Sequence, residues 1–447
     1  MRSPPENGTI VAPVSRPRSA SSLCRSVAAA ALTVALLAAS GCSGYEPPTG
    51  GTTPSAGMTA AAACVTDIPT VIARTASPDA ATGTLPATLV AALEAAAHTG
   101  FEQAAAPGAV VAVRTREGTW TKSYGLADPD RKTPMKAGVH TRIGSITKTF
   151  TGTLIMQLAE RQLLSIDDPI GEYVDGVPNG DRITLRQLAN MTSGVASYTR
   201  SESFTKRYFA KPETVFTPAE LLAAGLAESP LFEPGAQFDY SNTNTILLGL
   251  VIEKVTRQPV EKALDEQILK PLRLTQTIWP GDSTELPAPY AQGFTLQGDF
   301  ATPDAPSNAT HWNPAWAWTA GQLISTVDDL LVYGRALGTG QGLLAAKGQA
   351  ERLSSFPGAA GYGIGMGCVD GWVGHTGELP GYNTALYYDT TTDTTVVVQT
   401  NSDIASGDCP ADTPTLPDNS KELACSSPAT RIFVALTQAL GHPFVMP

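Results

Sequence analysis

A serine and a lysine stand three residues apart, as Ser145 and Lys148, at the start of an apolar segment that runs to about residue 164. The spacing of its apolar residues predicts a helix, so the two side chains would lie about one turn apart on the same face. A serine hydroxyl is a weak nucleophile until a base removes its proton, and a neutral lysine can be that base. Burial and the positive end of the helix would both lower the lysine pKa. This pair therefore predicts nucleophilic catalysis through a serine.

Tyr240-Ser241-Asn242 is the only Tyr-x-Asn sequence in the chain. In an extended loop, successive side chains point in alternating directions, so Tyr240 and Asn242 would point to the same side. If Lys148 stays protonated, its charge would lower the pKa of the phenol, and Tyr240 would carry protons between the serine and the leaving group. The residues do not decide which of the two is the base. Asn242 would hold Lys148 and a substrate amide oxygen, or, alternatively, cap the apolar helix that follows it.

His375, Thr376 and Gly377 lie on an expected strand. A strand edge lets a substrate backbone pair beside it, and Gly377 removes the side chain that would block this approach. Thr376 would donate to a carbonyl or carboxylate of the substrate. The backbone N–H of Glu378, together with that of Ser145, would form an oxyanion hole.

Two of these motifs have a second copy, and we interpret both copies as structural. Ser203 and Lys206 repeat the first spacing, but they lie in a polar stretch, residues 198–208, without an apolar helix to hold them. A second His-Thr-Gly occupies residues 98–100, where Gly100 would end an N-terminal helix as a C-cap.

The three motifs occur in one order, with Tyr240 95 residues after Ser145 and His375 135 residues after Tyr240. This order resembles that of serine penicillin-binding proteins and class C-like β-lactamases. The D-Ala-D-Ala carboxypeptidase branch is the most similar, because His375 stands where class C β-lactamases carry Lys. Other segments that look like landmarks of this family are residues 183–188, 192–194, 232–235 and 247–250.

The resemblance covers about residues 86–440 and implies roles for individual residues. Ser145 would be the acylated nucleophile, with Lys148 and Tyr240 as the proton-transfer groups. Asn242 and Thr376 would bind the substrate, a small molecule or a peptide such as one derived from peptidoglycan. No cofactor is implied. Carboxypeptidase, β-lactamase and esterase activities share this acylation step, and the sequence does not choose among them.

Two features depart from the carboxypeptidase pattern. A carboxypeptidase must hold the terminal carboxylate of its substrate, and some relatives use an Arg on the strand before the third motif. Residues 361–374 contain no Arg or Lys, and Glu378 places a carboxylate directly after the motif. We hypothesise that the substrate is neutral or amine-bearing at that end, or that Glu378 points away from the site.

Other classes of function fit the sequence less well. The chain has no Gly-x-Ser-x-Gly elbow, which disfavours an α/β-hydrolase. An inactive receptor that binds cell-wall fragments would have no need for an activated serine. The formal charge is −11, and residues after 41 carry −14, without the clusters of Lys and Arg that nucleic acid requires.

The order of expected elements predicts a mixed α/β fold. Strand patterns occur at residues 108–115 and 119–125, and again from residue 361 to 400. Helical periodicity fills much of the middle of the chain and includes residues 242–271. We therefore expect an antiparallel sheet built from both termini, flanked by helices, with an inserted helical lobe, in a single domain over residues 86–447.

The N-terminus has the pattern of an export signal. Arg16, Arg18 and Arg25 precede a short apolar run, residues 27–39, and small residues then lead into Cys42, as in a bacterial lipobox. We expect residues 1–41 to be a signal peptide, Cys42 to be lipidated and residues 42–85 to be a flexible tether. The protein would then lie on the outer face of the bacterial cell membrane. The alternative is a plain secretory signal.

The remaining cysteines fit an oxidising compartment. Cys64, Cys368, Cys409 and Cys425 are an even number, which predicts disulfides, and three pairings are open. Neither their spacing nor the five scattered His predicts a metal site. We expect the protein to be a monomer.

Overall fold

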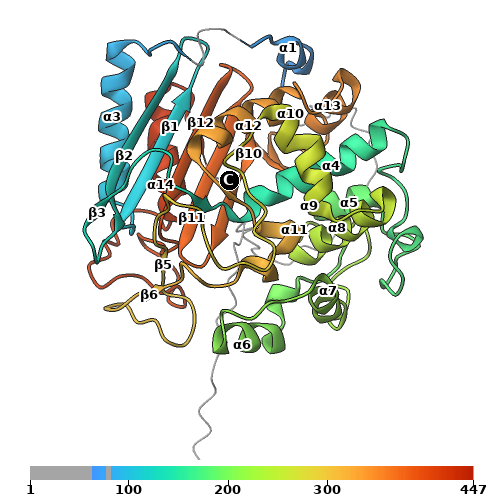
Figure 1. Cartoon of the computed structure of the whole chain (residues 1–447). Coiled ribbons are helices and arrows are strands. Elements are labelled where there is room, and N and C mark those ends of the chain that lie inside the picture. The colour runs from blue at the N-terminus through green and yellow to red at the C-terminus, as the bar shows by residue number, and fades with distance from the viewer. Residues whose placement is uncertain (1–62, 77–81, 446–447) are drawn as a thin grey trace, which may run out of the picture. The chain divides into compact units, whose positions relative to one another are not determined.

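Eight antiparallel strands form the central sheet of the computed structural model, which describes residues 63–76 and 82–445 (Figure 1). Their order is β3-β2-β1-β12-β11-β10-β9-β8, so strands from both ends of the chain meet where β1 pairs with β12. The strands are β1 Gly108–Arg114, β2 Thr119–Asp128, β3 Thr133–Pro134, β8 Ala360–Tyr362, β9 Gly367–Val369, β10 Trp372–Leu379, β11 Tyr382–Asp389 and β12 Thr394–Thr400. The predicted mixed fold and the origin of its sheet are confirmed.

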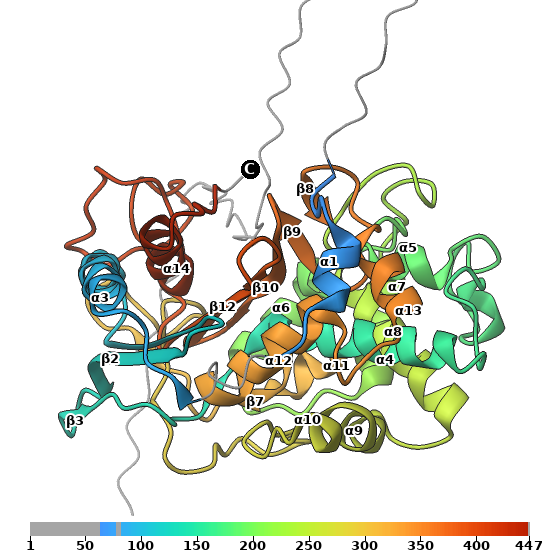
Figure 2. The same cartoon turned by 90° about the horizontal axis from the view of Figure 1, so that it is seen from above.

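Helices cover both faces of this sheet, because its central strands are apolar on both sides. Val110 and Ala112 of β1 pack into the core shared with the helical lobe, whereas Val111 and Val113 face the opposite way. The second face is covered by α3 (Ala87–Glu102) and α14 (Pro428–Ala439), which pack against each other (Figure 2). On the first face, α12 (Val327–Thr339) lies against β11 and β12.

The helical lobe is inserted between β3 and β8. Its central helix is α4, which is buried along most of its length and packs against α8 and α11. The lobe contains α4 Thr147–Glu160, α5 Leu185–Ala189, α6 Glu202–Ala210, α7 Pro218–Leu226, α8 Asn242–Thr256, α9 Val260–Leu264, α10 Lys270–Leu272, α11 Trp318–Gly321 and α13 Ala346–Leu353. Short strand pairs are β4 Thr141–Arg142 with β7 Ile324–Ser325 and β5 Phe294–Thr295 with β6 Ser307–Asn308.

The single helical run expected over residues 242–271 is interrupted. α8 ends at Thr256 and is followed by Arg257, which has a left-handed backbone with φ of +56°, and α9 begins directly after Pro259. Proline has no N–H and its ring clashes with the preceding helical turn, so it starts a new helix instead of continuing the old one. The start expected at residue 242 agrees with the first residue of α8, Asn242.

Part of the expected tether is ordered in the structure. Residues 63–76 contain the helix α1 (Ile68–Ala73), which contacts α12 and α13. Cys64 forms a disulfide with Cys368 of β9, and both side chains are buried. The prediction that the tether extends to residue 85 is therefore wrong for this stretch. Cys42 and most of the expected leader and tether lie outside the described residues.

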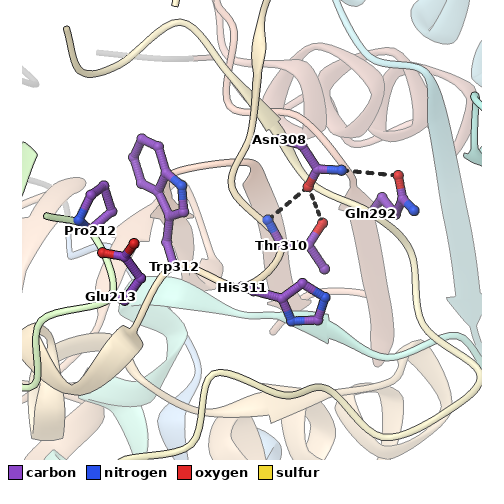
Figure 3. Close-up of a pocket in the computed structure, with 7 residues that line it drawn as sticks. All are labelled: Pro212, Glu213, Gln292, Asn308, Thr310, His311 and Trp312. Atoms are coloured by element: carbon purple, nitrogen blue, oxygen red, sulfur yellow. Dashed lines mark hydrogen bonds between the residues drawn. The ribbon is translucent and has the colours of Figure 1, made fainter. Parts of the chain in front are cut away.

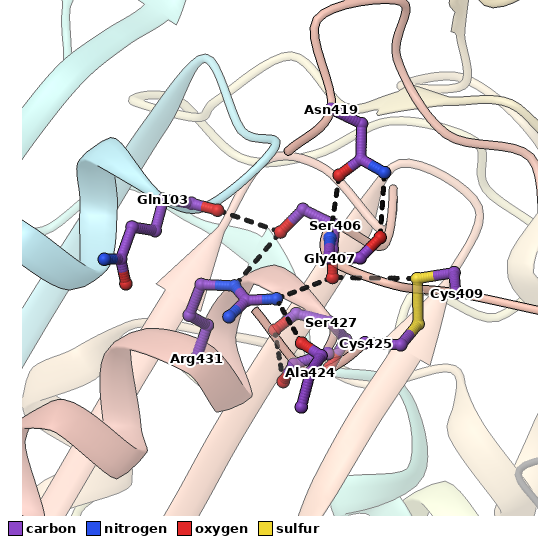
Figure 4. Close-up of a disulfide and its surroundings, with 10 residues drawn as sticks. Gln103, Ser406, Gly407, Cys409, Asn419, Ala424, Cys425, Ser427 and Arg431 are labelled. Carbon is purple, nitrogen blue, oxygen red and sulfur yellow. Dashed lines mark hydrogen bonds between the residues drawn. A yellow bond between two sulfur atoms is a disulfide. The ribbon is translucent and has the colours of Figure 1, made fainter. Parts of the chain in front are cut away.

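The other disulfide, between Cys409 and Cys425, closes a loop that follows β12 (Figure 4). Arg431 of α14 holds the same loop by donating hydrogen bonds to the carbonyl oxygens of Ser406 at 2.6 Å and Ala424 at 2.9 Å. The structure thus selects one of the three possible pairings. Within its described residues, no helix combines the length and the apolar character needed to cross a bilayer.

Replacing both Cys64 and Cys368 by alanine should lower the free energy of unfolding by about 2–5 kcal/mol, because the bridge restricts a very long loop of the unfolded chain. The two cysteines are 304 residues apart, compared with 16 for the other bridge. Urea unfolding of the full-length protein measures the effect, with the Cys409/Cys425 double alanine variant as the comparison. An unchanged urea midpoint in the Cys64/Cys368 variant would contradict the assignment of this bridge.

Candidate active site

Ser145 and Lys148 meet at the start of the central helix. Ser145 lies in a 3-10 turn, Gly144–Ile146, that leads directly into α4. The Nζ of Lys148 is 2.9 Å from the Oγ of Ser145 and donates a hydrogen bond to the carbonyl oxygen of Ala320 at 2.8 Å. Lys148 is 1% exposed, and burial lowers the pKa of its amine well below the usual value. Among the described residues it has no carboxylate partner, so its neutral form, which can accept a proton, is favoured.

Two glycines bring this turn against β10. A Cβ added to Gly377 would lie 1.8 Å from the carbonyl oxygen of Ile143, and one added to Gly144 would lie 2.4 Å from the backbone nitrogen of Glu378. Only glycine permits so close an approach of two backbones. This close approach places the backbone N–H of Glu378 beside Gly144, the residue that precedes Ser145. The two N–H groups expected to form an oxyanion hole therefore belong to neighbouring pieces of backbone.

Tyr240 reaches the same place from a loop 95 residues later. Its ring centroid is 5.0 Å from the Nζ of Lys148. Burial raises the pKa of the Tyr240 phenol, and the neighbouring hydroxyl of Ser145 offsets part of this increase. The Tyr240 hydroxyl makes no hydrogen bond of normal geometry within the described residues. It is therefore free to accept or donate a proton at Ser145.

Asn242 is the first residue of α8 and does not cap it. The preceding residue, Ser241, occupies the cap position, and its side chain makes no capping hydrogen bond. Asn242 donates through its backbone N–H to the Oγ of Ser197 at 3.1 Å and through Nδ2 to the Oγ1 of Thr199 at 3.3 Å. No hydrogen bond joins it to Lys148 in the described part of the chain. The N-cap alternative is therefore wrong, and the expected contact with Lys148 is not present.

His375 is a neutral partner in this site. Its Nδ1 pairs with the carbonyl oxygen of Thr376, which can only accept, so Nδ1 carries the hydrogen. Its Nε2 then accepts from the hydroxyl of Tyr362, at 3.0 Å. Burial, and secondly the amine of Lys148 whenever it is protonated, lowers the pKa of His375 to about 3. The rings of Tyr240, Tyr362 and His375 also pack against one another, with centroids 5.5–6.0 Å apart.

The edge of β10 beyond Gly374 is open. β9 pairs with β10 only from Trp372 to Gly374, so the rest of that edge has no partner strand in the described structure. Thr376 is partly exposed there, and its hydroxyl has no hydrogen-bond partner among the described residues. An extended substrate can therefore pair with this edge, as the sequence predicted for the third motif.

Glu378 lies on the same side of β10 as Thr376, two residues further on. Burial raises the pKa of its carboxyl, and the neighbouring carboxylate of Asp403 raises it further. Its side chain thus lies near a second acid, not near a cation. Three residues that the sequence did not single out complete this arrangement: Gly144, Tyr362 and Asp403. Of these three, only Gly144 could have been found from the sequence, because it directly precedes the serine.

The second copies of the two motifs lie elsewhere. Lys206 is on α6, is largely exposed, and pairs with Glu202 at 2.5 Å instead of with Ser203. Contrary to expectation, this segment is a helix, because Phe204 and Tyr208 bury one face of it. Gly100 does not end its helix either, since α3 continues to Glu102. A Cβ at Gly100 would lie 2.9 Å from the Cα of Ile432 on α14. Gly100 therefore permits the close packing of α3 and α14.

A separate pocket of about 330 Å³ contains none of the residues singled out from the sequence (Figure 3). Asn308 organises one wall of it by accepting hydrogen bonds from the backbone N–H and the hydroxyl of Thr310 and donating to Gln292. The full lining is Pro212, Glu213, Gln292, Asn308, Thr310, His311 and Trp312. Asn308, Thr310 and Gln292 thus satisfy one another along this wall.

Tyr240→Phe should lower kcat/KM by about 10²–10⁴-fold, because it keeps the ring that packs on Lys148 and His375 but removes the hydroxyl. Hydrolysis of p-nitrophenyl acetate by the purified protein measures this loss. Tyr124→Phe is the control, since Tyr124 lies on β2 and contacts α3 residues. Equal activity of Tyr240→Phe and the control would exclude the phenol from proton transfer.

Comparison with known proteins agrees with this geometry. The sequence matches the Beta-lactamase family over residues 88–414. It is 25% identical over 295 residues to a protein named penicillin-binding protein PbpX of Bacillus subtilis (strain 168), an alignment that covers 66% of this chain and 70% of that protein. It is 30% identical over 230 residues to Protein flp of Staphylococcus aureus (strain MRSA252), but covers only 44% of that longer protein and 50% of this chain.

Solved structures extend the comparison. A D-stereospecific amidohydrolase from Streptomyces sp. is 32% identical with a TM-score of 0.63, and the match covers 72% of this chain and 95% of that one. The D-amino acid amidase from Ochrobactrum anthropi SV3, complexed with L-phenylalanine amide, shares the fold at 23% identity with a TM-score of 0.66, over 79% of this chain and 98% of that one. Since the family match spans most of the chain and the site has the family's geometry, this protein belongs to the Beta-lactamase family of serine hydrolases.

Proposed function

We propose that this protein is an amidohydrolase that forms an acyl-enzyme on Ser145 and prefers substrates without a terminal carboxylate. The contact between Ser145 and the buried Lys148 carries the proposal. In the first step the Oγ of Ser145 attacks the substrate carbonyl, and neutral Lys148 takes the hydroxyl proton. The N–H groups of Ser145 and Glu378 hold the oxyanion that forms.

The remaining steps release the amine and the acid and return a proton to the Ser145 oxygen. As the C–N bond breaks, Tyr240 gives its proton to the leaving amine and takes one from protonated Lys148, which leaves an ester on Ser145 and a neutral Lys148. Water then attacks this ester while Lys148 takes its proton, and Lys148 returns that proton to the Oγ of Ser145 as the acid product leaves. Neutral His375 orients Tyr362 and contributes no charge, so Lys148 is the one amine at the reacting atoms within the described site.

Two observations support a substrate without a terminal carboxylate. Residues 361–374 contain no Arg or Lys that would bind one, and Glu378 supplies a carboxyl and no cation in their place. The D-stereospecific amidohydrolase from Streptomyces sp. is similar over nearly its whole length. A D-Ala-D-Ala carboxypeptidase remains the second candidate, because the order of the three motifs and the relative named a penicillin-binding protein both favour it.

A hydrolysis panel on the purified full-length protein tests the proposal. The panel contains D-phenylalaninamide, an acyl-D-Ala-D-Ala peptide, nitrocefin and p-nitrophenyl acetate, each also measured with Ser145→Ala. We expect the amide to be hydrolysed with the highest kcat/KM of the amide-bond substrates and every activity to be lost in the variant. Preferred turnover of acyl-D-Ala-D-Ala would favour the carboxypeptidase, and activity that survives in Ser145→Ala would contradict the acyl-enzyme.

We also propose that the protein is exported, lipidated at Cys42 and monomeric. Two disulfides support an oxidising compartment, and the residues around Cys42 support the lipid anchor. A penicillin-binding protein homologue from Pyrococcus abyssi with the same fold is octameric, so the mass of the purified protein in solution is the relevant test. Cys42→Ala should release the protein from the membrane fraction.

A further inference from the structure

Aromatic rings continue outward from the Ser145 site on the side of Tyr240. The ring centroid of Tyr240 is 5.0 Å from the Nζ of Lys148, and the ring centroid of Tyr362 is 6.0 Å from that of Tyr240. Phe238 continues the series, with its ring centroid 6.2 Å from that of Tyr362. Three successive rings thus lead from the amine that contacts the Ser145 oxygen toward the protein surface. We call Phe238 and Tyr362 the aromatic wall.

Phe238 is the outer ring of this wall and is 46% exposed. Single exposed rings are common on protein surfaces, so exposure alone does not indicate a site. Phe300, for example, is 73% exposed and has no ring contact among the described residues. Phe238 differs because it contacts Tyr362, whose other ring contacts are Tyr240 and His375. An exposed ring that continues into a reactive site offers a surface for an apolar part of the ligand.

The loop that carries Phe238 is held at the next residue. The backbone N–H of Asp239 donates to the carbonyl oxygen of Met191 at 3.0 Å, and its carboxylate accepts from the Nη2 of Arg200 at 2.8 Å. This ion pair also means that the charges nearest to Phe238 in the loop are paired with each other. Because the backbone beside Phe238 is already fixed, a ligand would not have to order this loop, which lowers the entropy cost of binding.

The aromatic wall and its hydrogen-bond partner are uncharged. The hydroxyl of Tyr362 donates to the Nε2 of His375 at 3.0 Å. Burial raises the pKa of Tyr362 and lowers that of His375 to about 3, so both side chains are neutral. Residues 361–374, which include Tyr362, contain no Arg or Lys. A carboxylate placed against this wall would lose water without gaining a cation, whereas an apolar group would gain contact with the rings.

The position of the wall indicates which part of the substrate it contacts. In the proposed function, Tyr240 gives its proton to the leaving amine, so the leaving nitrogen lies at the Tyr240 hydroxyl. A substituent on that nitrogen then lies next to the rings that pack on Tyr240. We propose that Phe238 and Tyr362 bind an aromatic or other apolar group carried by the leaving amine of the substrate. This inference rests on the proposed function and adds a substrate class to it, the amides of apolar amines.

Calorimetric titration of the full-length Ser145→Ala variant tests the wall without requiring turnover. The ligands are D-alanine benzylamide, with a ring on the leaving amine, D-alanine methylamide, without a ring, and D-phenylalanine methylamide, with the ring on the acyl side. We expect the benzylamide to bind at least about 10-fold more tightly than D-alanine methylamide, because its ring leaves water for two aromatic rings. Adding Phe238→Ala should remove most of this difference. Phe300→Ala, which also removes an exposed ring, is the matched control and should preserve it.

Equal binding of the benzylamide and D-alanine methylamide would overturn the proposal, as would unchanged binding of the benzylamide after Phe238→Ala. If Phe238→Ala weakens D-phenylalanine methylamide as strongly as the benzylamide, the wall does not select the leaving amine and the proposal is wrong. The outcome is separate from that of the proposed function. A wild-type protein that hydrolyses amides through Ser145 without this discrimination loses only the subsite, whereas discrimination without amide turnover supports the subsite and contradicts the amidohydrolase.

Discussion

Lys148→Arg should lower kcat/KM for p-nitrophenyl acetate by about 10³-fold or more, because arginine keeps the positive charge but cannot act as a base near neutral pH. The effect is large because Lys148 is the amine within hydrogen-bonding distance of the Ser145 oxygen, and no described carboxylate stabilises its charged form. Lys206→Arg, at the second Ser-x-x-Lys, is the matched control, since that side chain is largely exposed and pairs with Glu202. Similar activity of the two variants would mean that the base is a different group.

The pH dependence of the wild type should distinguish Lys148 from Tyr240. Burial lowers the pKa of Lys148 and raises that of Tyr240. If neutral Lys148 is the base, kcat/KM rises with pH through its lowered pKa, and the rise is complete before ordinary lysines lose their protons. If the Tyr240 phenolate is the base, the rise occurs only at strongly alkaline pH. We expect the first result, and we expect this rise to be absent in Lys148→Arg.

Gly144→Ala should lower kcat by about 10²–10³-fold, the typical effect of losing one oxyanion-hole donor. A Cβ at this position would lie 2.4 Å from the backbone nitrogen of Glu378 and 2.8 Å from its carbonyl oxygen. Neither backbone atom can move without displacing β10 from the turn that carries Ser145. The N–H of Glu378 would therefore be pushed away from the reacting carbonyl.

Gly138→Ala separates this close approach from simple backbone strain. Gly144 and Gly138 both have positive φ, +53° and +81°, but a Cβ at Gly138 would have no neighbour within 4 Å. The control should lose only about 1–2 kcal/mol of stability and keep its kcat. Steady-state kinetics and thermal unfolding of both variants measure the difference. If Gly144→Ala keeps its kcat, the contact of Gly144 with β10 does not position the backbone N–H of Glu378 for catalysis.

The sequence predicted the parts of this site that depend on near neighbours. Ser145 and Lys148 are three residues apart, and helical geometry alone brings such a pair to one face. The antiparallel sheet was also predictable, since short runs rich in β-branched and aromatic residues between turn residues are a property of each segment. Local reasoning failed where packing intervened: α6 forms because Phe204 and Tyr208 are buried by the surrounding lobe. Gly100 likewise serves a contact with α14, which follows more than 300 residues later.

By itself, the sequence determined the spacing of the Ser145–Lys148 pair, the order of the motifs and the family that they resemble, because these depend on residue types and short spacings. The tertiary structure decided which cysteines pair, that Tyr362 contacts His375, and that Asp403 lies beside Glu378. Each of these contacts joins residues from different strands or loops. Their proximity depends on strand register and on the packing of the whole chain, which no short segment encodes.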